Sequence, residues 1–475
     1  MLYHLLMGGK EDSERTALHI KREKYTFCEL HRWAKAFSVF LQNKGIRQGD
    51  RVAIIANVNI DTVIAILGCI FYGAVFVPID ARFYKENDCR IAKEIEAKLI
   101  INGLPQELMK SSMSYENRIR ERMNEKAQVY ILYTSGSTSR PKGIIACVRQ
   151  VVFCIEKINL RLQNGTEDKI LCAIPLSFDY GLYQIFLSLA SGSELYLEDG
   201  RVLQHLPGIL QKEGITAFPA VPSMLALLCR AKLLQRVKLP CLRYICWTGD
   251  RLSLRIVEEL HSVFPDVELL PMYGLTECKR VSIMPLNCYE KTKRGSCGLP
   301  LDGVQVYLQN VDSNKVGELI VIGENVMEAV GKDETFSIDP MTGQRMLKTG
   351  DLFFIDEDGF LYFYGRKKRM IKSNGFRIGN AQIEGILEVL ESVSEVRIEG
   401  IPDDVSGEKI GAAIFGNEEA FQQEYEGIKD SISTLLRPQV FYFSRKPLPK
   451  NKNGKFDDKK ISRILAERGS KWNGK

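Results

Sequence analysis

Short hydrophobic runs rich in β-branched residues alternate with longer segments along the first part of the chain. The runs, each of which is expected to form a buried strand, are residues 51–56, 74–79, 129–133, 169–174, 194–198, 215–221, 242–247 and 267–273. Most of them are followed by a segment of helical length in which apolar residues recur every three or four positions, as in residues 180–191. Continuous apolar strands that alternate with helices predict mainly parallel sheets covered on both faces.

The pattern changes after about residue 295, where short glycine-rich strands take over and a hairpin turn is expected at residues 356–359. Residues 366–377 then hold six positive charges and predict a charged hinge at 366–370, between a domain of residues 1–367 and a domain of residues 368–475. The second domain is expected to be a small α+β unit, with helices at 381–391 and near 419–436 and strands near 395–401 and 409–416.

Composition narrows the class of protein. The chain has 475 residues, 45% of them hydrophobic, and a net charge of only +6, which fits a globular protein of two to four domains and argues against a dedicated nucleic-acid-binding protein. Its 12 cysteines are scattered without a C-x-x-C motif, so free thiols in a reducing cytoplasm are expected rather than a zinc site. We expect no signal peptide and no membrane span, because glycine and proline interrupt the longest apolar run, residues 63–79.

A loop rich in serine, threonine and glycine follows the expected strand 129–133 and has the sequence TSGSTSRPKG, residues 134–143. Glycine allows the backbone to approach a ligand closely, hydroxyl groups donate hydrogen bonds, and Lys142 adds a positive charge, so the loop predicts a binding site for a triphosphate. The spacing is not that of a P-loop nucleoside triphosphatase or kinase, which requires G-x-x-x-x-G-K-[ST].

This loop resembles the signature of the adenylate-forming (AMP-binding) enzymes, which include acyl-CoA synthetases, adenylation domains of peptide synthetases, and luciferases. Other motifs of that family follow in order: YTFCEL (25–30), GDRVAI (49–54), AVFVPID (74–80), LSFDYGLYQIFLSLASGSELYL (176–197), MYGLTE (272–277), GELIVIG (317–323), KTGD (348–351), GRKKRMIKSNGFRI (365–378) and PKNKNGK (449–455). The resemblance implies an α/β fold, with doubly wound sheets and a β-rich subdomain in a large N-terminal domain and a small mobile α+β C-terminal domain.

The resemblance implies an AMP-forming ligase, closest in type to a stand-alone adenylation enzyme of secondary metabolism. Such an enzyme uses ATP and Mg²⁺ to convert a carboxylic acid into an acyl-AMP and pyrophosphate. It then transfers the acyl group to a phosphopantetheine thiol, either on an acyl or peptidyl carrier protein or, as the alternative, on CoA. A non-catalytic relative is a third hypothesis, which predicts loss of motif residues that are all present here: Lys142, Glu277, Asp351 and Lys455.

The ATP site is implied residue by residue. The β- and γ-phosphates would be held by Thr134, Ser135, Gly136, Ser137, Thr138 and Lys142. In the motif MYGLTE, Tyr273 would stack on adenine, next to Gly274, and Thr276 would bind the α-phosphate. Glu277 would be the ligand of Mg²⁺, which prefers oxygen ligands.

Three further positions complete the implied nucleotide site. Asp351 would accept hydrogen bonds from the ribose, and Arg366 would contact the ribose or a phosphate. Lys455 would bridge the carboxylate and the α-phosphate, so together with Thr276, Glu277 and Lys142 it is implied as a catalytic residue.

Domain movement is implied by the positions of three residues. Because Lys455 belongs to the small domain, that domain must close over ATP for adenylation. Lys368 occupies the family's hinge position, about which the small domain would turn to allow thioester formation. Gly375 would then line the entry of the pantetheine arm.

The acid substrate would lie against Phe178, Asp179, Tyr183 and Met272. In amino-acid adenylation domains an aspartate at the position of Asp179 binds the α-ammonium group, so an amino acid or a small aryl acid is favoured. Aryl or fatty acids stay an alternative, since some ligases for acids without an amine also carry FDYG. The adjacent pair Lys279 and Arg280 faces either a second acidic group of the substrate or the solvent.

Overall fold

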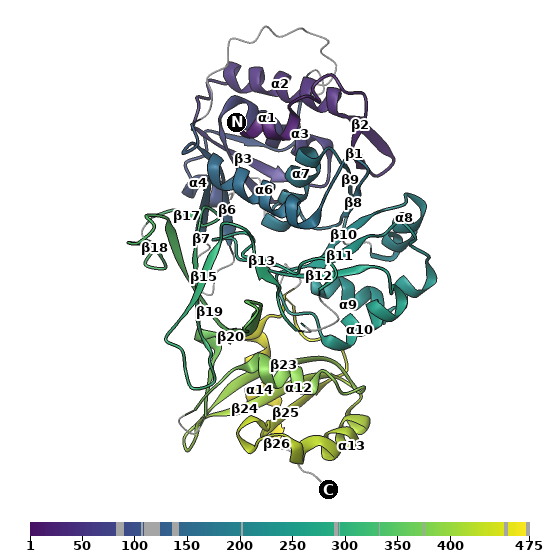
Figure 1. Ribbon diagram of the computed structural model, residues 1–475, viewed down its shortest axis with the longest axis vertical. Coiled ribbons are helices and arrows are strands. Elements are labelled where there is room, and N and C mark those ends of the chain that lie inside the picture. The colour runs from purple at the N-terminus through teal and green to yellow at the C-terminus, as the bar shows by residue number, and fades with distance from the viewer. Residues whose placement is uncertain are drawn as a thin grey trace.

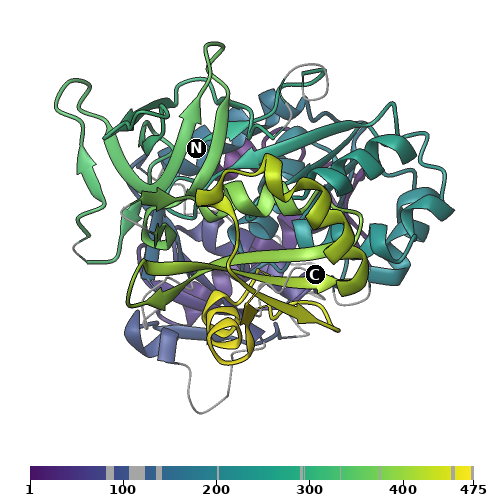
Figure 2. The ribbon, with the colours of Figure 1, turned by 90° about the horizontal axis from the view of Figure 1, so that it is seen from below.

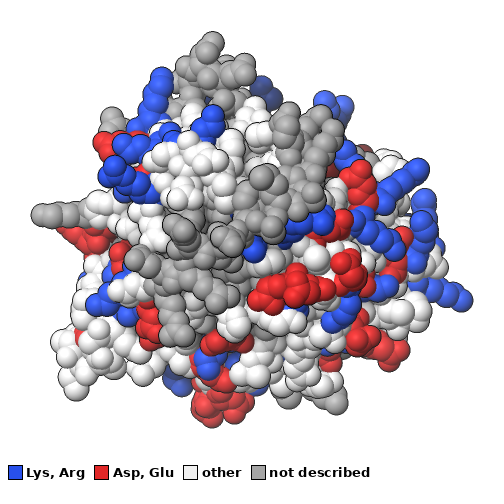
Figure 3. All heavy atoms as spheres, turned by 90° about the horizontal axis from the view of Figure 1, so that it is seen from above, with Lys and Arg blue, Asp and Glu red and all other residues white. Residues whose placement is uncertain are grey.

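The computed structural model of the chain describes residues 1–81, 90–105, 108, 124–134, 142–200, 203–288, 293, 295–331, 333–373, 376–450 and 455–471. The molecule is elongated, with a large N-terminal part at the top of Figure 1 and a small C-terminal part at the bottom. On the face that Figure 3 shows, coloured basic and acidic side chains lie interspersed. Within the described ranges we find no helix that is both long enough and apolar enough to cross a membrane.

The first sheet of the large part has six strands in the order β17-β7-β6-β4-β3-β5. Their bounds are Arg51–Ala56 (β3), Val75–Asp80 (β4), Leu99–Ile101 (β5), Gln128–Thr134 (β6), Lys142–Cys147 (β7) and Glu328–Ala329 (β17). From β5 through β3 and β4 to β6, adjacent strands are parallel. Strand β7 is antiparallel to β6, and these two strands flank the serine-rich loop.

The second sheet has nine strands in the order β14-β13-β12-β11-β10-β8-β9-β1-β2. Its parallel part runs from β1 to β12 through β9, β8, β10 and β11. The bounds are Thr16–Ile20 (β1), Glu23–Thr26 (β2), Lys169–Cys172 (β8), Glu194–Leu197 (β9), Ala217–Ala220 (β10), Tyr244–Trp247 (β11), Glu268–Tyr273 (β12), Ser282–Ile283 (β13) and Leu299–Pro300 (β14). All the strands expected between residues 51 and 273 are therefore confirmed, as is their mainly parallel arrangement.

The helices of the large part pack on these two sheets, and a single hydrophobic core joins both. Their bounds are Leu2–Met7 (α1), Phe27–Asn43 (α2), Ile60–Tyr72 (α3), Arg90–Glu94 (α4), Val148–Leu162 (α6), Asp179–Ser191 (α7), Leu206–Lys212 (α8), Pro222–Arg230 (α9) and Leu254–Val263 (α10). Helix α7 begins directly after Phe178 and ends where Gly192 adopts a left-handed conformation, with φ of 75°. The hydroxyl of Tyr180, in the first turn of α7, donates to the carbonyl of Cys246 in β11 at 3.1 Å, which fixes this turn next to β11.

A third sheet forms the β-rich subdomain, with strands Gln305–Gln309 (β15), Gly317–Ile322 (β16), Phe336–Ile338 (β18), Arg345–Ile355 (β19) and Leu361–Arg366 (β20). Strands β19 and β20 are antiparallel neighbours, which confirms the hairpin expected at residues 356–359. In this register Asp351 lies directly opposite Arg366.

The C-terminal part is an α+β unit with its own hydrophobic core, which begins at Ile371, whereas the core of the large part ends at Leu361. The predicted domain boundary, which stays a prediction, falls between these two residues. The elements of the C-terminal part are Ile371–Ser373 (β21), Phe376–Ile378 (β22), Asn380–Leu387 (α12), Val393–Asp403 (β23), Gly407–Gly416 (β24), Glu418–Ile428 (α13), Val440–Ser444 (β25), Asp458–Arg468 (α14) and Ser470–Lys471 (β26).

The helix expected near residues 419–436 was predicted too long. Helix α13 ends at Ile428 and is followed by two short 3₁₀ turns. Gly427 lies in its last turn, and the hydroxyl of Ser431 donates to the carbonyl of Ile428 at 2.6 Å. A side chain that bonds the backbone in this way competes with continuation of the helix.

Three arginine side chains of the large part, Arg230, Arg251 and Arg255, contact the C-terminal part, and we refer to these as the arginine contacts. Figure 2 shows the C-terminal part lying across the face of the large part that carries α9 and α10. The arginine contacts reach the main-chain oxygens of Ala381 (2.7 Å), Glu391 (2.6 Å), Val393 (3.4 Å) and Ser394 (3.3 Å), and the carboxylates of Glu388 (3.6 Å) and Glu395 (3.2 Å). They hold the two parts together at this face.

Candidate active site

The predicted nucleoside-binding residues come together at the end of β12. The hydroxyl of Tyr273, the last residue of β12, donates to Oδ2 of Asp351 at 2.9 Å, and Nε of Arg366 lies 3.3 Å from Oδ1. Asp351 is only 3% exposed, and burial raises its pKa against the opposing effect of Arg366, of Tyr273 and of Lys455. Residues from three separate motifs thus form one connected polar group.

Removing the Tyr273 hydroxyl tests this group. In Tyr273→Phe the buried carboxylate of Asp351 loses a donor, and hydrogen bonds to charged groups contribute about 1.5–3 kcal/mol. Because Arg366 remains, we expect the lower end of that range, a roughly 10-fold rise in the KM for ATP. Pyrophosphate exchange at varied ATP concentration measures this KM. Tyr307→Phe is the matched control, since Tyr307 is 43% exposed on β15, and equal KM values for the two variants would contradict the prediction.

The turn that follows β12 requires glycine at position 274. A Cβ atom added at Gly274 would lie 1.6 Å from the carbonyl oxygen of Lys279, so no other residue fits without moving the turn. The amide of Val281 donates to the carbonyl of Tyr273 at 2.9 Å and closes the same turn. Thr276 and Glu277 are thereby held partly buried in this turn beside the polar group of Tyr273 and Asp351.

Burial and two nearby cations act on the pKa of Glu277. Burial raises the pKa of Glu277, while the charges of Lys142 and Arg366 act in the opposite direction. A carboxylate near the basic groups that are predicted to bind phosphate fits the coordination of Mg²⁺, which usually takes one or two carboxylates together with substrate phosphates. Glu277 could therefore hold the ion.

The loop of residues 134–143, predicted to bind the triphosphate, is only partly described. Thr134 ends β6 opposite Lys142 at the start of β7, whereas Ser135, Gly136, Ser137 and Thr138 lie outside the described residues, as does Gly375. Lys142 forms an ion pair with Asp333 and lies 4.6 Å from the ring centre of Phe336. The sequence did not point to this partner, because Asp333 lies almost 200 positions further along the chain.

Lys455 of the C-terminal part reaches the site formed by the large part. A side-chain carbon added at Gly249, in the loop after β11, would lie 3.5 Å from Cε of Lys455. The charge of Lys455 favours the ionised forms of Asp179 and Asp351. The implied catalytic lysine thus lies near both the predicted acid site and the predicted nucleoside site. Lys368, the predicted hinge residue, lies exposed in a 3₁₀ turn, Lys367–Arg369.

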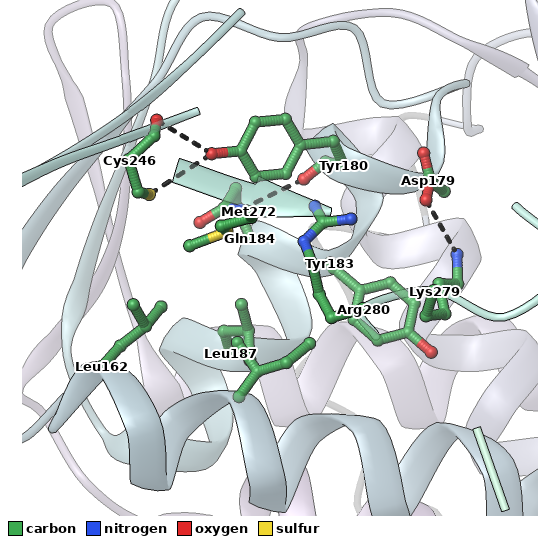
Figure 4. A pocket seen from close by; sticks show the side chains of 11 residues that line it. Leu162, Asp179, Tyr180, Tyr183, Gln184, Leu187, Cys246, Met272, Lys279 and Arg280 are labelled. Atoms are coloured by element: carbon green, nitrogen blue, oxygen red, sulfur yellow. Dashed lines mark hydrogen bonds and ion pairs between the residues drawn. The ribbon is translucent and has the colours of Figure 1, made fainter. Parts of the chain in front are cut away.

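A pocket opens at the start of α7 and lies between α6, α7, β11, β12 and the turn after β12 (Figure 4). It is lined by Ile158, Leu162, Asp179, Tyr180, Tyr183, Gln184, Leu187, Cys246, Met272, Lys279 and Arg280. The free space at its centre is about 10 Å³, enough for roughly one water molecule. Asp179, Tyr183 and Met272 line it as expected, while Phe178 packs against the hydrophobic core next to it.

Two cations are buried in this pocket. Lys279 is 2% exposed and Arg280 is 5% exposed, so the alternative that this pair faces solvent is wrong. Nζ of Lys279 lies 3.7 Å from Oδ2 of Asp179, and the guanidinium of Arg280 lies 4.6 Å from the ring centre of Tyr180. The sequence signal that could have found them is the adjacent Lys-Arg pair between Cys278 and Val281, which are both fully buried.

The charged groups in the pocket shift one another's pKa values. Burial alone would raise the pKa of Asp179, but Lys279, Arg280 and Lys455 outweigh it, so this pKa lies below its ordinary value. Burial lowers the pKa of Lys279 to about 8, although Asp179 opposes the change. Asp179 is therefore ionised at neutral pH, and Lys279 is mainly protonated.

Comparisons with known proteins identify relatives of this chain. Residues 8–329 match the model of a family described as AMP-binding enzyme. A probable CoA ligase CCL5 of Humulus lupulus is 27% identical over 399 residues, which cover 80% of this chain and 71% of that protein. Gramicidin S synthase 2 of Brevibacillus brevis is 26% identical over 494 residues, 96% of this chain but 11% of that protein. This chain spans about a tenth of that peptide synthetase.

Solved structures show the same fold. ATP-bound MatB from Rhodopseudomonas palustris superposes with a TM-score of 0.87 at 20% identity, covering 98% of this chain and 99% of that one. VinN in complex with L-aspartate is 29% identical, with a TM-score of 0.66, and covers 77% of this chain and 98% of that one. The fold class expected from the sequence is therefore confirmed.

Proposed function

Because this chain belongs to the AMP-binding enzyme family and is an AMP-forming ligase, we propose that it activates a small amino acid for transfer to a phosphopantetheine thiol. The observation that carries the proposal is the ionised carboxylate of Asp179 in the pocket at the start of α7, within the influence of Lys455. An ammonium group of the substrate is a chemically matched partner for such a carboxylate. The solved complex of the related VinN with L-aspartate supports an amino acid as well.

In the proposed first step, a carboxylate oxygen of the acid attacks the α-phosphorus of ATP, and the bond to pyrophosphate breaks. Asp179 would orient the acid, while Tyr273, Asp351 and Arg366 would orient the nucleoside. Lys142 and Lys455 would stabilise negative charge on the phosphates, the second of them where the attacking and α-phosphate oxygens meet. Mg²⁺, held by Glu277 when bound, would neutralise phosphate charge. No covalent bond to the protein is needed.

In the proposed second step, the thiol sulfur attacks the acyl carbon and AMP leaves. For that step Lys455 must move away, and the C-terminal part would turn about Lys368. The exposed 3₁₀ turn around Lys368 and the polar character of the arginine contacts support this movement, because polar contacts can be exchanged for hydrogen bonds to water.

A proline at the hinge tests the movement. Lys368→Pro fixes φ and restricts the residue before it, so we expect thioester formation to fall at least 10-fold more than pyrophosphate exchange, about 1.4 kcal/mol of extra barrier. Lys368→Ala, which removes the side chain but keeps the backbone free, should retain the wild-type ratio. If the ratio of the two rates is the same in wild type and Lys368→Pro, the chain turns elsewhere.

The acceptor of the proposed reaction is a carrier-protein thiol, with CoA as the second candidate because CoA ligases are among the relatives. We place the reaction in the cytoplasm, as the scattered cysteines predict. ATP–pyrophosphate exchange across amino, aryl and fatty acids tests the first step. Acyl transfer to CoA and to a pantetheinylated carrier protein, measured side by side with the acid thus identified, tests the second. Exchange with aryl or fatty acids alone would overturn the amino-acid proposal.

A further inference from the structure

We propose that Lys279 and Arg280 bind a second carboxylate of the acid substrate, so that the enzyme activates an acid with two carboxyl groups. The inference rests on the proposed function, because it concerns the same pocket. It adds the chemical class of the substrate, and it assigns these two residues to specificity.

The first argument is an excess of buried positive charge. Lys279 and Arg280 are 2% and 5% exposed, and both line the pocket together with a single carboxylate, Asp179. The charge of Lys455 also acts on Asp179. Burying a charge is costly unless an opposite charge or hydrogen bonds compensate for it. Lys279 already has Asp179 and the ring of Tyr183 beside it, whereas no carboxylate of the described residues forms an ion pair with Arg280.

The second argument is the lack of hydrogen-bond acceptors. Nζ of Lys279 is buried without a hydrogen bond among the described residues, and its distance to Asp179 is 3.7 Å, which is too long for one. Among the residues that the structure describes, the guanidinium of Arg280 has neither a hydrogen-bond partner nor an ion-pair partner. It lies beside the ring of Tyr180. In Figure 4 the Arg280 side chain extends into the pocket beside Tyr180. These donors are available to a ligand.

A role of Lys279 in neutralising Asp179 would explain only half of this arrangement. The charge of Arg280 also acts on Asp179, but its guanidinium lies against the ring of Tyr180 and forms no ion pair with that carboxylate. A guanidinium presents a planar fork of donors that fits a carboxylate in particular. With the substrate ammonium at Asp179, a neighbouring carboxylate would lie between Lys279 and Arg280, and positive and negative groups would alternate through the pocket.

The wild-type enzyme provides a first test without any mutation. Pyrophosphate exchange is measured with aspartate, with its two monoamides asparagine and isoasparagine, and with the glutamate series of one more carbon. The better dicarboxylic acid should exceed both of its own monoamides in kcat/KM by about 10- to 150-fold, as expected when a charge-assisted hydrogen bond is lost. A monoamide or a neutral amino acid that matches or exceeds its dicarboxylic parent overturns the inference but leaves the proposed function intact. Absence of exchange with every acid of the wider panel would instead refute the proposed function.

Arg280→Met supplies the second test, with Arg280→Lys as the matched variant that keeps the charge. The ratio of kcat/KM for the dicarboxylic acid to that for its preferred monoamide should fall about 10- to 150-fold in Arg280→Met and less in Arg280→Lys, mainly through KM. Thermal unfolding checks that each variant folds. If Arg280→Met leaves this ratio as it is in wild type, Arg280 does not bind the carboxylate and the inference is wrong. If the variant does not fold, the wild-type comparison decides.

Discussion

Replacing Lys455 with alanine is expected to nearly abolish adenylation while leaving thioester formation from a supplied acyl-AMP largely intact. Lys455 lies beside Gly249, and its charge already acts on the carboxylates at both predicted substrate sites, Asp179 and Asp351. Loss of one group that stabilises developing charge typically lowers kcat by about 10²–10³-fold, or about 2.7–4 kcal/mol. Pyrophosphate exchange measures the first half-reaction, and thioester formation from synthetic acyl-AMP measures the second.

The matched control for this experiment is Lys459→Ala. Lys459 is an exposed lysine in the first turn of α14, four positions away, and its loss should change neither half-reaction. An equal decrease of both half-reactions in Lys455→Ala would show that the C-terminal part does not alternate between two positions.

Local pattern was sufficient to predict the elements that carry the site. The apolar runs before Thr134 and Tyr273 are continuous, so their burial in a sheet, and the position of a polar loop at the end of each, could be predicted from spacing alone. The proximity of Lys455 to Gly249 could not, because it depends on how two separately packed units dock. No periodicity in the sequence encodes that docking.

Replacing Asp179 with alanine is expected to weaken activation of the preferred amino acid by about 10- to 150-fold, corresponding to loss of a charge-assisted hydrogen bond of about 1.5–3 kcal/mol. The acid that lacks the amine should be spared or even improved, because the variant removes the carboxylate and leaves Lys279 and Arg280 as an unopposed positive surface. The two acids are compared on both proteins by pyrophosphate exchange, which gives a double difference in kcat/KM.

The control for Asp179→Ala must separate binding from helix structure, since the Asp179 carboxylate also accepts a hydrogen bond from the backbone of Tyr180 at the start of α7. Asp179→Asn keeps an acceptor for that bond and removes the charge, so it should resemble Asp179→Ala in selectivity but not in thermal stability. Equal harm to both acids would make Asp179 a structural residue. A wild-type preference for the acid without the amine would refute the amino-acid proposal.

Only some of the side-chain positions in the pocket could be predicted from the sequence. The position of Asp179 at the start of a helix could be predicted, because the apolar spacing of α7 begins there. Whether Lys279 and Arg280 face solvent or the substrate could not, since a charged pair is normally exposed. Their burial follows from the tight turn at Gly274, which folds residues 279 and 280 back under β12. Likewise, the partner of Lys142 depends on β17 pairing with β7, a contact between distant segments.

The arginine contacts have a consequence for sequence divergence and for protein engineering. Four of their acceptors are main-chain oxygens, at Ala381, Glu391, Val393 and Ser394, and a main-chain oxygen is present whatever side chain the position carries. Substitutions can therefore accumulate along this edge of the C-terminal part without loss of docking, provided that the backbone keeps its path. A C-terminal part taken from a divergent homologue should therefore seat on the same three arginines.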